Sequence, residues 1–464
     1  MRPCAVAVVL VVALAGLGAL AAVRLVGQRS DDRADRSGST WTPQTCPADV
    51  EVEVVPEHTC GWVSAPLGDS TQQVFVVVVE PPAPSDRSPI LETGTDLGMA
   101  PDYAGLAPIA QRTGRRTVIV DLPGTGHSVP SLDCSDAESL GDAAAGSSAL
   151  VEAIGTCRDR LAAEGVDPGL MTPQHSAAVL LAVMDAVGSE RWVLMGHGTT
   201  GATAVEVARE HPDRVEALVL DSAVHVHDGW RARRSALLRR VASACAADVR
   251  CARRHGDVLA RWREARRRAA TRPVDLEGVP LDRELLDRAV RWLVAPVSSG
   301  PAQLPDLLGE AAAGRRGPVL DRFATALRLA PPLCVGVLPK CVTREQVVLG
   351  AVLSGVCPTA AGREPYVAVC ARWGIGEQAA DDDAVVGVPT LVLHGELDPY
   401  ATAAEASAQV RRWVSGAHLV VARGRGHNVL GDQCARSVRN DWLAGPLDRA
   451  PLLPTCVDED VDFP

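Results

Sequence analysis

The sequence predicts an α/β fold with a mostly parallel central sheet, flanked by helices and interrupted by an inserted helical segment. Two observations lead to this fold class. Residues 46–221 and 386–464 contain short apolar runs rich in β-branched residues, which are typical of buried strands. About 165 residues of mostly helical character separate the two blocks. One sheet with a helical insertion at residues 222–385 accounts for both observations.

The N-terminus indicates export. Residues 3–23 form a run of 21 residues without a charge. The apolar part of a signal peptide usually has about 7–15 residues, whereas a membrane span needs about 20. Length therefore favours an uncleaved signal anchor at residues 1–29, while the A-L-A sequence at residues 19–21 resembles a cleavage site for a secreted protein. Both interpretations predict export, to the outer face of the cell membrane or beyond it, and residues 30–45 follow as a polar linker.

The cysteine count agrees with export. Of the 13 cysteines, Cys4 lies in the apolar N-terminus and twelve remain, an even number that predicts disulfides in an exported chain. The sequence alone does not determine connectivity, although pairing of neighbours would close six short loops. No cysteine or histidine spacing matches a metal site, so we expect no metal and no cofactor. The twelve cysteines are Cys46, Cys60, Cys134, Cys157, Cys245, Cys251, Cys334, Cys341, Cys357, Cys370, Cys434 and Cys456.

Charge excludes nucleic acid as the main partner, because the net charge is −11 and the pI is near 5.5. Residues 231–272 are an exception, with fourteen arginines against three acidic residues. The simpler interpretation is a pair of amphipathic helices with solvated arginine faces. The alternative is a basic patch for an anionic ligand or envelope polymer.

The strongest motif is V-L-M-G-H-G-T-T-G-A-T at residues 193–203. An apolar strand at residues 192–195, a turn of small residues and a helix at residues 201–210 have the layout of a nucleophile elbow, which lifts a serine above the sheet in G-x-S-x-G hydrolases. Here Gly198 occupies the nucleophile position. Glycine has no side chain, so the framework lacks its attacking atom. Moving the frame to Thr199 or Thr200 would break the spacing to both flanking strands.

The second block supplies two further members of a catalytic triad. Asp398 follows an apolar strand at residues 390–394, and His427 lies on a loop after a strand at residues 418–421. The order of nucleophile position, acid and histidine is that of α/β-hydrolases. The alternatives are that Asp398 caps the helix that follows it and that His427 is an ordinary loop histidine.

The remaining elements are predicted from local pattern. We expect strands at residues 73–79 and 117–120, a turn followed by a buried strand within residues 211–221, and a helix at residues 172–187 that leads into the elbow strand.

The chain resembles the α/β-hydrolase family, and within it the exported tripeptidyl-aminopeptidase-like serine peptidases. The resemblance rests on G-H-G-T-T-G before H-P-D-R-V, on G-E-L-D-P around the acid, on G-H-N-V-L around the histidine and on a cysteine soon after it. It covers roughly residues 46–456. It implies an α/β-hydrolase fold with a helical lid over residues 222–385 and a TAP-like C-terminal part at residues 386–464.

The resemblance also implies an oxyanion loop after the strand at residues 89–91, formed by Gly94, Thr95 and Asp96 together with Thr199 of the elbow. The related proteins have a G-G-P-G-like turn there, whereas this chain has L-E-T-G-T-D-L-G. Backbone donors in that loop stabilise negative charge that develops in a dry site, so a carboxylate at Asp96 or Glu92 would oppose it. The alternative is that both carboxylates point to solvent.

These observations predict a catalytically impaired hydrolase of the serine peptidase or esterase type. We expect a monomer whose lidded pocket binds a small-molecule, peptide-like or acyl ligand, with the N-terminal segment in the membrane if it is not cleaved. The alternative is an active peptidase or esterase that uses Thr199, Thr200 or a residue outside the elbow, within hydrogen-bond reach of His427.

A zinc site is a third alternative. It would use His197, His427 and Asp398, with Asp96 nearby. Two histidines and a carboxylate are suitable zinc ligands, but their spacing matches no known ligand motif.

Overall fold

The computed structural model describes residues 40–48, 50, 58–68, 70–93, 106–130, 148–167, 173–198, 200–223, 230–294, 299–329, 385–457 and 463. The strands are β1 (Trp41–Gln44), β2 (His58–Leu67), β3 (Ser70–Val79), β4 (Ile90–Glu92), β5 (Thr117–Val120), β6 (Trp192–His197), β7 (Val215–Asp221), β8 (Asp275–Leu276), β9 (Val279–Pro280), β10 (Thr390–Gly395) and β11 (His418–Ala422).

The helices lie between and after these strands. They are α2 (Leu106–Thr113), α4 (Ser148–Ala163), α5 (Pro173–Val187), α6 (Thr200–Glu210), α7 (Trp230–Ala247), α8 (Val249–His255), α9 (Val258–Thr271), α10 (Arg283–Val294), α11 (Leu304–Ala313), α12 (Pro318–Leu329), α15 (Ala403–Trp413) and α16 (Gln433–Ala444). Short 3-10 helices are η5 (Pro212–Arg214), η6 (Gly300–Gln303), η7 (Val429–Gly431) and η8 (Thr455–Val457).

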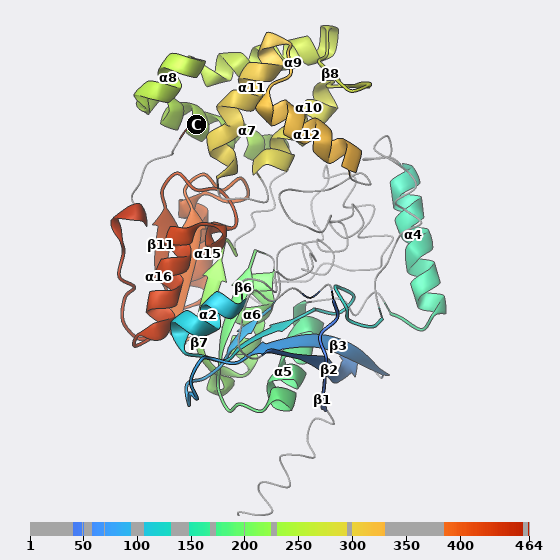
Figure 1. The fold of residues 1–464 in the computed structure, drawn as a ribbon, viewed down its shortest axis with the longest axis vertical. Coiled ribbons are helices and arrows are strands. Elements are labelled where there is room, and N and C mark those ends of the chain that lie inside the picture. Colours follow the sequence, from blue (N-terminus) through green and yellow to red (C-terminus); the bar gives the residue numbers. More distant parts are fainter. Residues whose placement is uncertain are drawn as a thin grey trace, which may run out of the picture.

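The described residues form a nine-stranded sheet that joins both sheet-forming blocks of the sequence (Figure 1). Its order is β1-β2-β3-β5-β4-β6-β7-β10-β11. The pairs from β5 through β11 are parallel, whereas the pairs that involve β1, β2 and β3 are antiparallel. The prediction of a mostly parallel sheet flanked by helices is confirmed.

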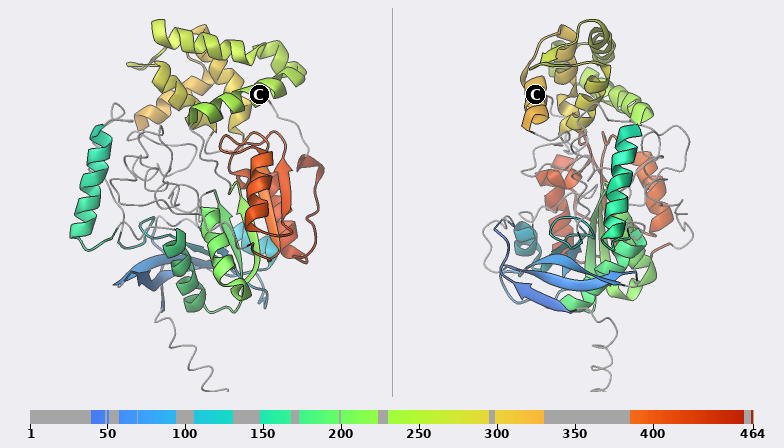
Figure 2. Two further views of the ribbon diagram at one scale, coloured as in Figure 1. Left: turned by 180° about the vertical axis from the view of Figure 1, so that it is seen from behind. Right: turned by 90° about the vertical axis from the view of Figure 1, so that its right-hand side faces the viewer.

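Both faces of the sheet are covered, as the views from behind and from the side show (Figure 2). In β6, Trp192 and Leu194 pack into the cluster that contains residues of α5, α6 and α15, while Val193 and Met195 pack into the cluster that contains residues of α2 and α16. Side chains alternate between the faces of a strand, so a strand covered on both faces is apolar throughout. This explains the continuous apolar run before the elbow.

The end of the predicted linker is a strand instead. Within residues 30–45, β1 pairs antiparallel with β2, and Trp41 packs against the core. Gly61 of β2 permits this pairing, because a Cβ there would lie 2.4 Å from the carbonyl oxygen of Thr42. The linker prediction is therefore wrong for residues 41–44.

The inserted helices have a core of their own. Between β7 and β10 in the chain, α7 to α12 and the β8–β9 hairpin gather at one end of the sheet (Figure 1). Their cluster of buried apolar residues also takes in two residues from beyond β10, Leu397 and Phe463. The insertion thus contacts the segment that precedes the predicted acid.

Each disulfide whose two cysteines are both among the described residues joins cysteines that are neighbours in the sequence order of the twelve. Bonds join Cys46 to Cys60, Cys245 to Cys251 and Cys434 to Cys456. Cys157 is also disulfide-bonded. The other predicted disulfide cysteines lie outside the described residues: Cys134, Cys334, Cys341, Cys357 and Cys370.

Over the described part of the chain, no helix combines the length and the apolar character needed to cross a membrane. The predicted signal peptide or anchor at residues 1–29 lies outside that part.

Candidate active site

In the turn between β6 and α6, the residue at the predicted nucleophile position has a left-handed backbone conformation. Gly198 has a φ of +51°, and its N–H donates to the carbonyl oxygen of Asp221 at 2.8 Å. A residue with a Cβ disfavours this left-handed region by roughly 1–2 kcal/mol. The strand ends at His197 and the helix begins at Thr200, so Gly198 lies at the tip of the elbow. Thr199 lies outside the described residues.

Two other glycines allow the elbow to be this tight. A Cβ on Gly196 would lie 2.6 Å from the Cα of Gly201, and a Cβ on Gly201 would lie 2.4 Å from the Cβ of Ala223. Real Cβ atoms do not approach other carbons so closely. The helix can therefore turn back over the strand end only with glycine at both positions.

The hydroxyl of Thr200 stabilises the turn through hydrogen bonds to the backbone of His197. Its Oγ1 donates to the carbonyl oxygen of His197 at 2.9 Å and accepts the N–H of the same residue at 3.0 Å. A nucleophilic hydroxyl must give its proton to a base. Thr200 would first have to break the hydrogen bond that it donates to the carbonyl oxygen of His197.

Asp398 and His427 form a buried acid–base pair. Nδ1 of His427 lies 2.8 Å from Oδ2 of Asp398, and both side chains are buried. Because a carboxylate oxygen accepts, Nδ1 donates and Nε2 is left as the basic atom of the ring. The carboxylate also accepts the N–H groups of Tyr400 at 2.7 Å and Ala401 at 3.4 Å through Oδ1.

The surroundings of Asp398 favour its charged form. Burial works against the charge, but the charge and hydrogen bond of His427, the nearby His394 and the N–H of Tyr400 outweigh it and hold the pKa of Asp398 below its ordinary value. Asp398 is not a helix cap. Thr402 caps α15, in a capping box with Glu405.

The loop that carries His427 is held by the end of β7. Oδ1 and Oδ2 of Asp221 accept the N–H groups of Val429 and Leu430, each at 3.0 Å. The hydroxyl of Ser222 accepts the N–H of Asn428 at 3.1 Å. Because the carbonyl oxygen of Asp221 also accepts the N–H of Gly198, this one residue contacts both the elbow and the histidine loop.

A buried ion network lies beside the elbow. His197 places Nε2 3.2 Å from Oε1 of Glu92 and Nδ1 3.3 Å from Oδ2 of Asp221. Burial opposes protonation, but hydrogen bonds and charges from the two carboxylates overcome it and raise the pKa of His197 to about 10. Burial raises the pKa of Asp221, but the hydrogen bond and charge of His197, the N–H of Leu430 and the charge of His427 overcome this effect and lower it. His197 is therefore a cation at neutral pH.

Glu92 faces inward. Its side chain is buried against His197, so the interpretation that it points to solvent is wrong. Arg439 of α16 is buried nearby, and its pKa is lowered to about 10 by burial, which the charges of Glu92 and Asp221 partly offset. Two carboxylates and two cations thus balance in this region. Gly94, Thr95 and Asp96 lie outside the described residues.

The sequence contained a signal for part of this network. Arg439 lies four residues after Ala435 and three before Trp442, both of which are buried, so a charged residue occupies the apolar face of α16. A buried arginine needs a carboxylate partner. Nothing local in the sequence indicates that Glu92 and His197 meet, because they are far apart in the chain.

The histidines of the zinc alternative belong to two different groups. His197 faces Glu92 and Asp221, whereas His427 faces Asp398. Among the described residues, no group of three or more histidine, cysteine or acidic side chains is arranged to hold a metal ion.

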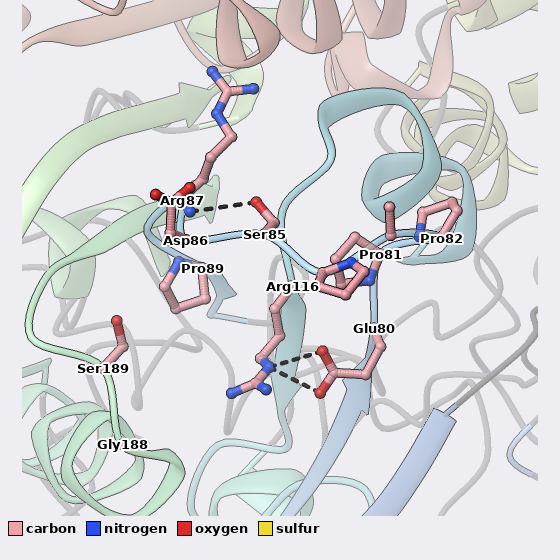
Figure 3. Close-up of a pocket in the computed structure, with 12 residues that line it drawn as sticks. Glu80, Pro81, Pro82, Ser85, Asp86, Arg87, Pro89, Arg116, Gly188 and Ser189 are labelled. Carbon is pink, nitrogen blue, oxygen red and sulfur yellow. Dashed lines mark hydrogen bonds and ion pairs between the residues drawn. The ribbon is translucent and has the colours of Figure 1, made fainter.

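A surface cavity of about 710 Å³ is lined by none of these residues. Figure 3 shows its lining. Its lining includes Pro89, Arg116 and Ser189, which precede β4, β5 and β6, and Arg116 forms an ion pair with Glu80 at 2.9 Å. The strands are parallel, so this cavity is at the amino edge of the sheet, opposite the elbow. The predicted ligand pocket beneath the insertion remains a prediction.

Two family models match the chain. Residues 95–267 match the model described as alpha/beta hydrolase fold, and residues 359–449 match the model described as TAP-like protein. No curated protein matches the sequence.

Solved structures of hydrolases show a low similarity. A proline iminopeptidase from Mycobacterium smegmatis has 17% identity and a TM-score of 0.43, over 82% of this chain and 97% of the other. A thermophilic esterase from Thermogutta terrifontis has 17% identity and a TM-score of 0.41, over 82% and 97%. A carboxylesterase from Bacillus subtilis has 15% identity and a TM-score of 0.36, over 82% and 89%. The mostly parallel sheet and the match over residues 95–267 show an α/β-hydrolase fold, and residues 359–449 are similar to TAP-like proteins.

Proposed function

We propose that this protein is an exported hydrolase-fold protein of the serine peptidase or esterase type that lacks its nucleophile and binds a peptide-like or acyl ligand. One observation carries the proposal. Gly198 has the strained conformation at the tip of the elbow, while Asp398 and His427 remain paired at 2.8 Å. The base is in place, but the residue that it would activate has no side chain.

The expected loss of activity is large. Removal of a triad serine lowers kcat by about 10⁶-fold and leaves roughly 10³–10⁴-fold catalysis over water from the rest of the site. The competing proposal of an active threonine nucleophile gains no support from Thr200, whose hydroxyl bonds to the backbone of His197.

Labelling with a fluorophosphonate probe tests the proposal. The wild-type protein should neither label nor hydrolyse aminoacyl or p-nitrophenyl esters above a heat-treated control, because it has no activated hydroxyl. Gly198→Ser should gain labelling, since the added hydroxyl lies at the elbow tip, and Gly198→Ser combined with His427→Ala should lose it again. The strained φ will destabilise the serine variant by roughly 1–2 kcal/mol, so its folding is checked by thermal unfolding.

Two other outcomes would distinguish a second defect in the oxyanion loop from a threonine nucleophile. If Gly198→Ser is folded but silent, the addition of Asp96→Gly should restore labelling when the oxyanion loop is the second defect. Wild-type hydrolysis that Thr199→Ala or Thr200→Ala abolishes would overturn the proposal and establish a threonine nucleophile.

A further inference from the structure

We infer that α7 of the insertion holds the catalytic acid in place through Arg240, a positioning residue for the Asp398–His427 pair. The acid loop, residues 396–402, connects β10 to α15 and carries Asp398. This inference deepens the proposed function and rests on it only for the role of the pair in catalysis. It concerns how the acid is supported, and its main test does not require activity.

Arg240 hydrogen-bonds to the main chain on both sides of Leu397. Its Nη1 donates to the carbonyl oxygen of Glu396 and its Nη2 to that of Asp398, each at 2.7 Å. The planar guanidinium provides two donors in a rigid fork, so this contact fixes the direction of the loop as well as its distance from α7.

An apolar contact supports the fork. Leu397 is buried in the hydrophobic cluster of the insertion, not in the clusters of the sheet. The residue directly before the acid is therefore anchored in the helices, while its two carbonyl neighbours bond to Arg240. Asp398 faces the other way, toward His427.

A second arginine of α7 secures the far end of the loop. Nη1 of Arg233 contacts Oε1 and Oε2 of Glu405 at 2.9 and 2.8 Å. Glu405 in turn accepts the N–H of Thr402 at 2.7 Å in the capping box of α15. One helix of the insertion thus contacts both ends of the acid loop.

The partly buried location of the Arg240 guanidinium strengthens its two hydrogen bonds to the acid loop. Burial lowers the pKa of Arg240, an effect that the charges of Asp398 and Glu405 partly offset. Hydrogen bonds from a charged group are stronger than those from a neutral one. The partners are more than 150 residues away in the chain, so the geometry of the acid depends on how the insertion docks.

The hydrogen bond between His427 and Asp398 provides the readout. In protein with ¹⁵N-labelled histidine, the Nδ1 proton of His427, assigned by its loss in His427→Gln, should resonate far downfield in the wild type. Arg240→Met should shift this resonance upfield or broaden it beyond detection, because the acid is no longer held against the ring. Arg240→Lys, which keeps the charge but replaces the planar fork by a single ammonium group, should be intermediate. Arg239→Met is the matched control, since Arg239 is exposed on the same helix.

An unchanged resonance in folded Arg240→Met would overturn the inference. If Arg240→Met does not fold, an unchanged resonance in Arg240→Lys has the same meaning. In the Gly198→Ser background, Arg240→Met should slow fluorophosphonate labelling about tenfold, whereas Arg239→Met should leave it unchanged. If Gly198→Ser itself stays silent, the proposed function is what fails, and the resonance still decides the role of Arg240.

Discussion

At the scale of single residues, a neutral balance of buried charges lies beside Gly198 and the elbow. Protonated His197 separates Glu92 from Asp221, and Asp221 uses its remaining acceptor capacity on the histidine loop. Without a cation between them, the two carboxylates would be buried near each other at a high desolvation cost. His197 therefore stabilises the part of the sheet edge where the elbow and the His427 loop meet.

This arrangement predicts that the protein loses stability in mild alkali. The pKa of His197 is raised from 6.5 to about 10 by folding, so its contribution is complete below about pH 6.5 and falls as pH rises through 10. Each unit of pKa difference corresponds to about 1.4 kcal/mol, so the fall should be measurable. Urea unfolding between pH 6 and 10.5 would reveal it.

His197→Gln is the control for that measurement. The chain has one lysine and three tyrosines, and these groups and Arg439, with its pKa lowered to about 10, are present in both proteins, so the difference between the two profiles reports on His197. The variant should be less stable at neutral pH and should show a flatter profile. Parallel profiles for the two proteins would contradict the assigned charge of His197.

At the scale of elements, the contact between α6 and the ends of β6 and β7 determines the shape of the elbow. The helix begins three residues after the strand ends and crosses it where Gly196, Gly201 and Ala223 meet. Small residues at this point bring the backbone of Gly198 to the carbonyl of Asp221. The local crowding also limits which substitutions the frame tolerates.

Gly201→Ala should therefore be destabilising. Its Cβ would collide with Ala223, and overpacking of this kind typically costs about 1–3 kcal/mol. Gly309→Ala in α11 is a matched control, because its nearest neighbour would be 3.8 Å away, and alanine in a helix interior is favoured by about 0.5–1 kcal/mol. Chemical denaturation should show a lower free energy of unfolding for Gly201→Ala and a higher one for Gly309→Ala. A stabilised Gly201→Ala variant would contradict the close packing.

At the scale of the whole molecule, the disulfides whose two cysteines are both among the described residues close short loops at three separate places. The bonds described here join residues 6, 14 and 22 positions apart. Short loops let each bond form without threading of distant elements. Cys434–Cys456 ties the segment after α16 back to the start of that helix, close behind the loop of His427.

Peptide mapping without reduction should recover these three bonds and no free thiol beyond Cys4. Loops of about 15 residues contribute roughly 3 kcal/mol through the entropy of the unfolded chain. Replacing the Cys434–Cys456 pair by alanines should therefore lower the midpoint of thermal unfolding clearly, since this bond closes a loop of comparable length. Several free cysteines in the native protein would contradict both the pairing and the proposed export.

Features that depend on neighbours in the chain could be predicted from the sequence alone. The strands at residues 117–120 and 192–195 and the helix at residues 172–187 were among them, because apolar period and turn residues are local properties. The sequence left the disulfide pairing open, and the structure shows the bond between Cys434 and Cys456. Asp398 and His427 also came from local context, as each follows a buried strand at the same sheet edge.

Tertiary structure decided what depends on distant partners. Only the folded chain shows that β1 extends into the predicted linker, where Gly61 gives it room, and that Glu92 turns inward to a protonated His197. The reach of Arg240 from α7 to the acid loop belongs here too. A polar group taken out of water needs a partner, and the partners of Glu92 and Arg240 (His197, and the carbonyl oxygens of Glu396 and Asp398) lie more than 100 residues away in the chain.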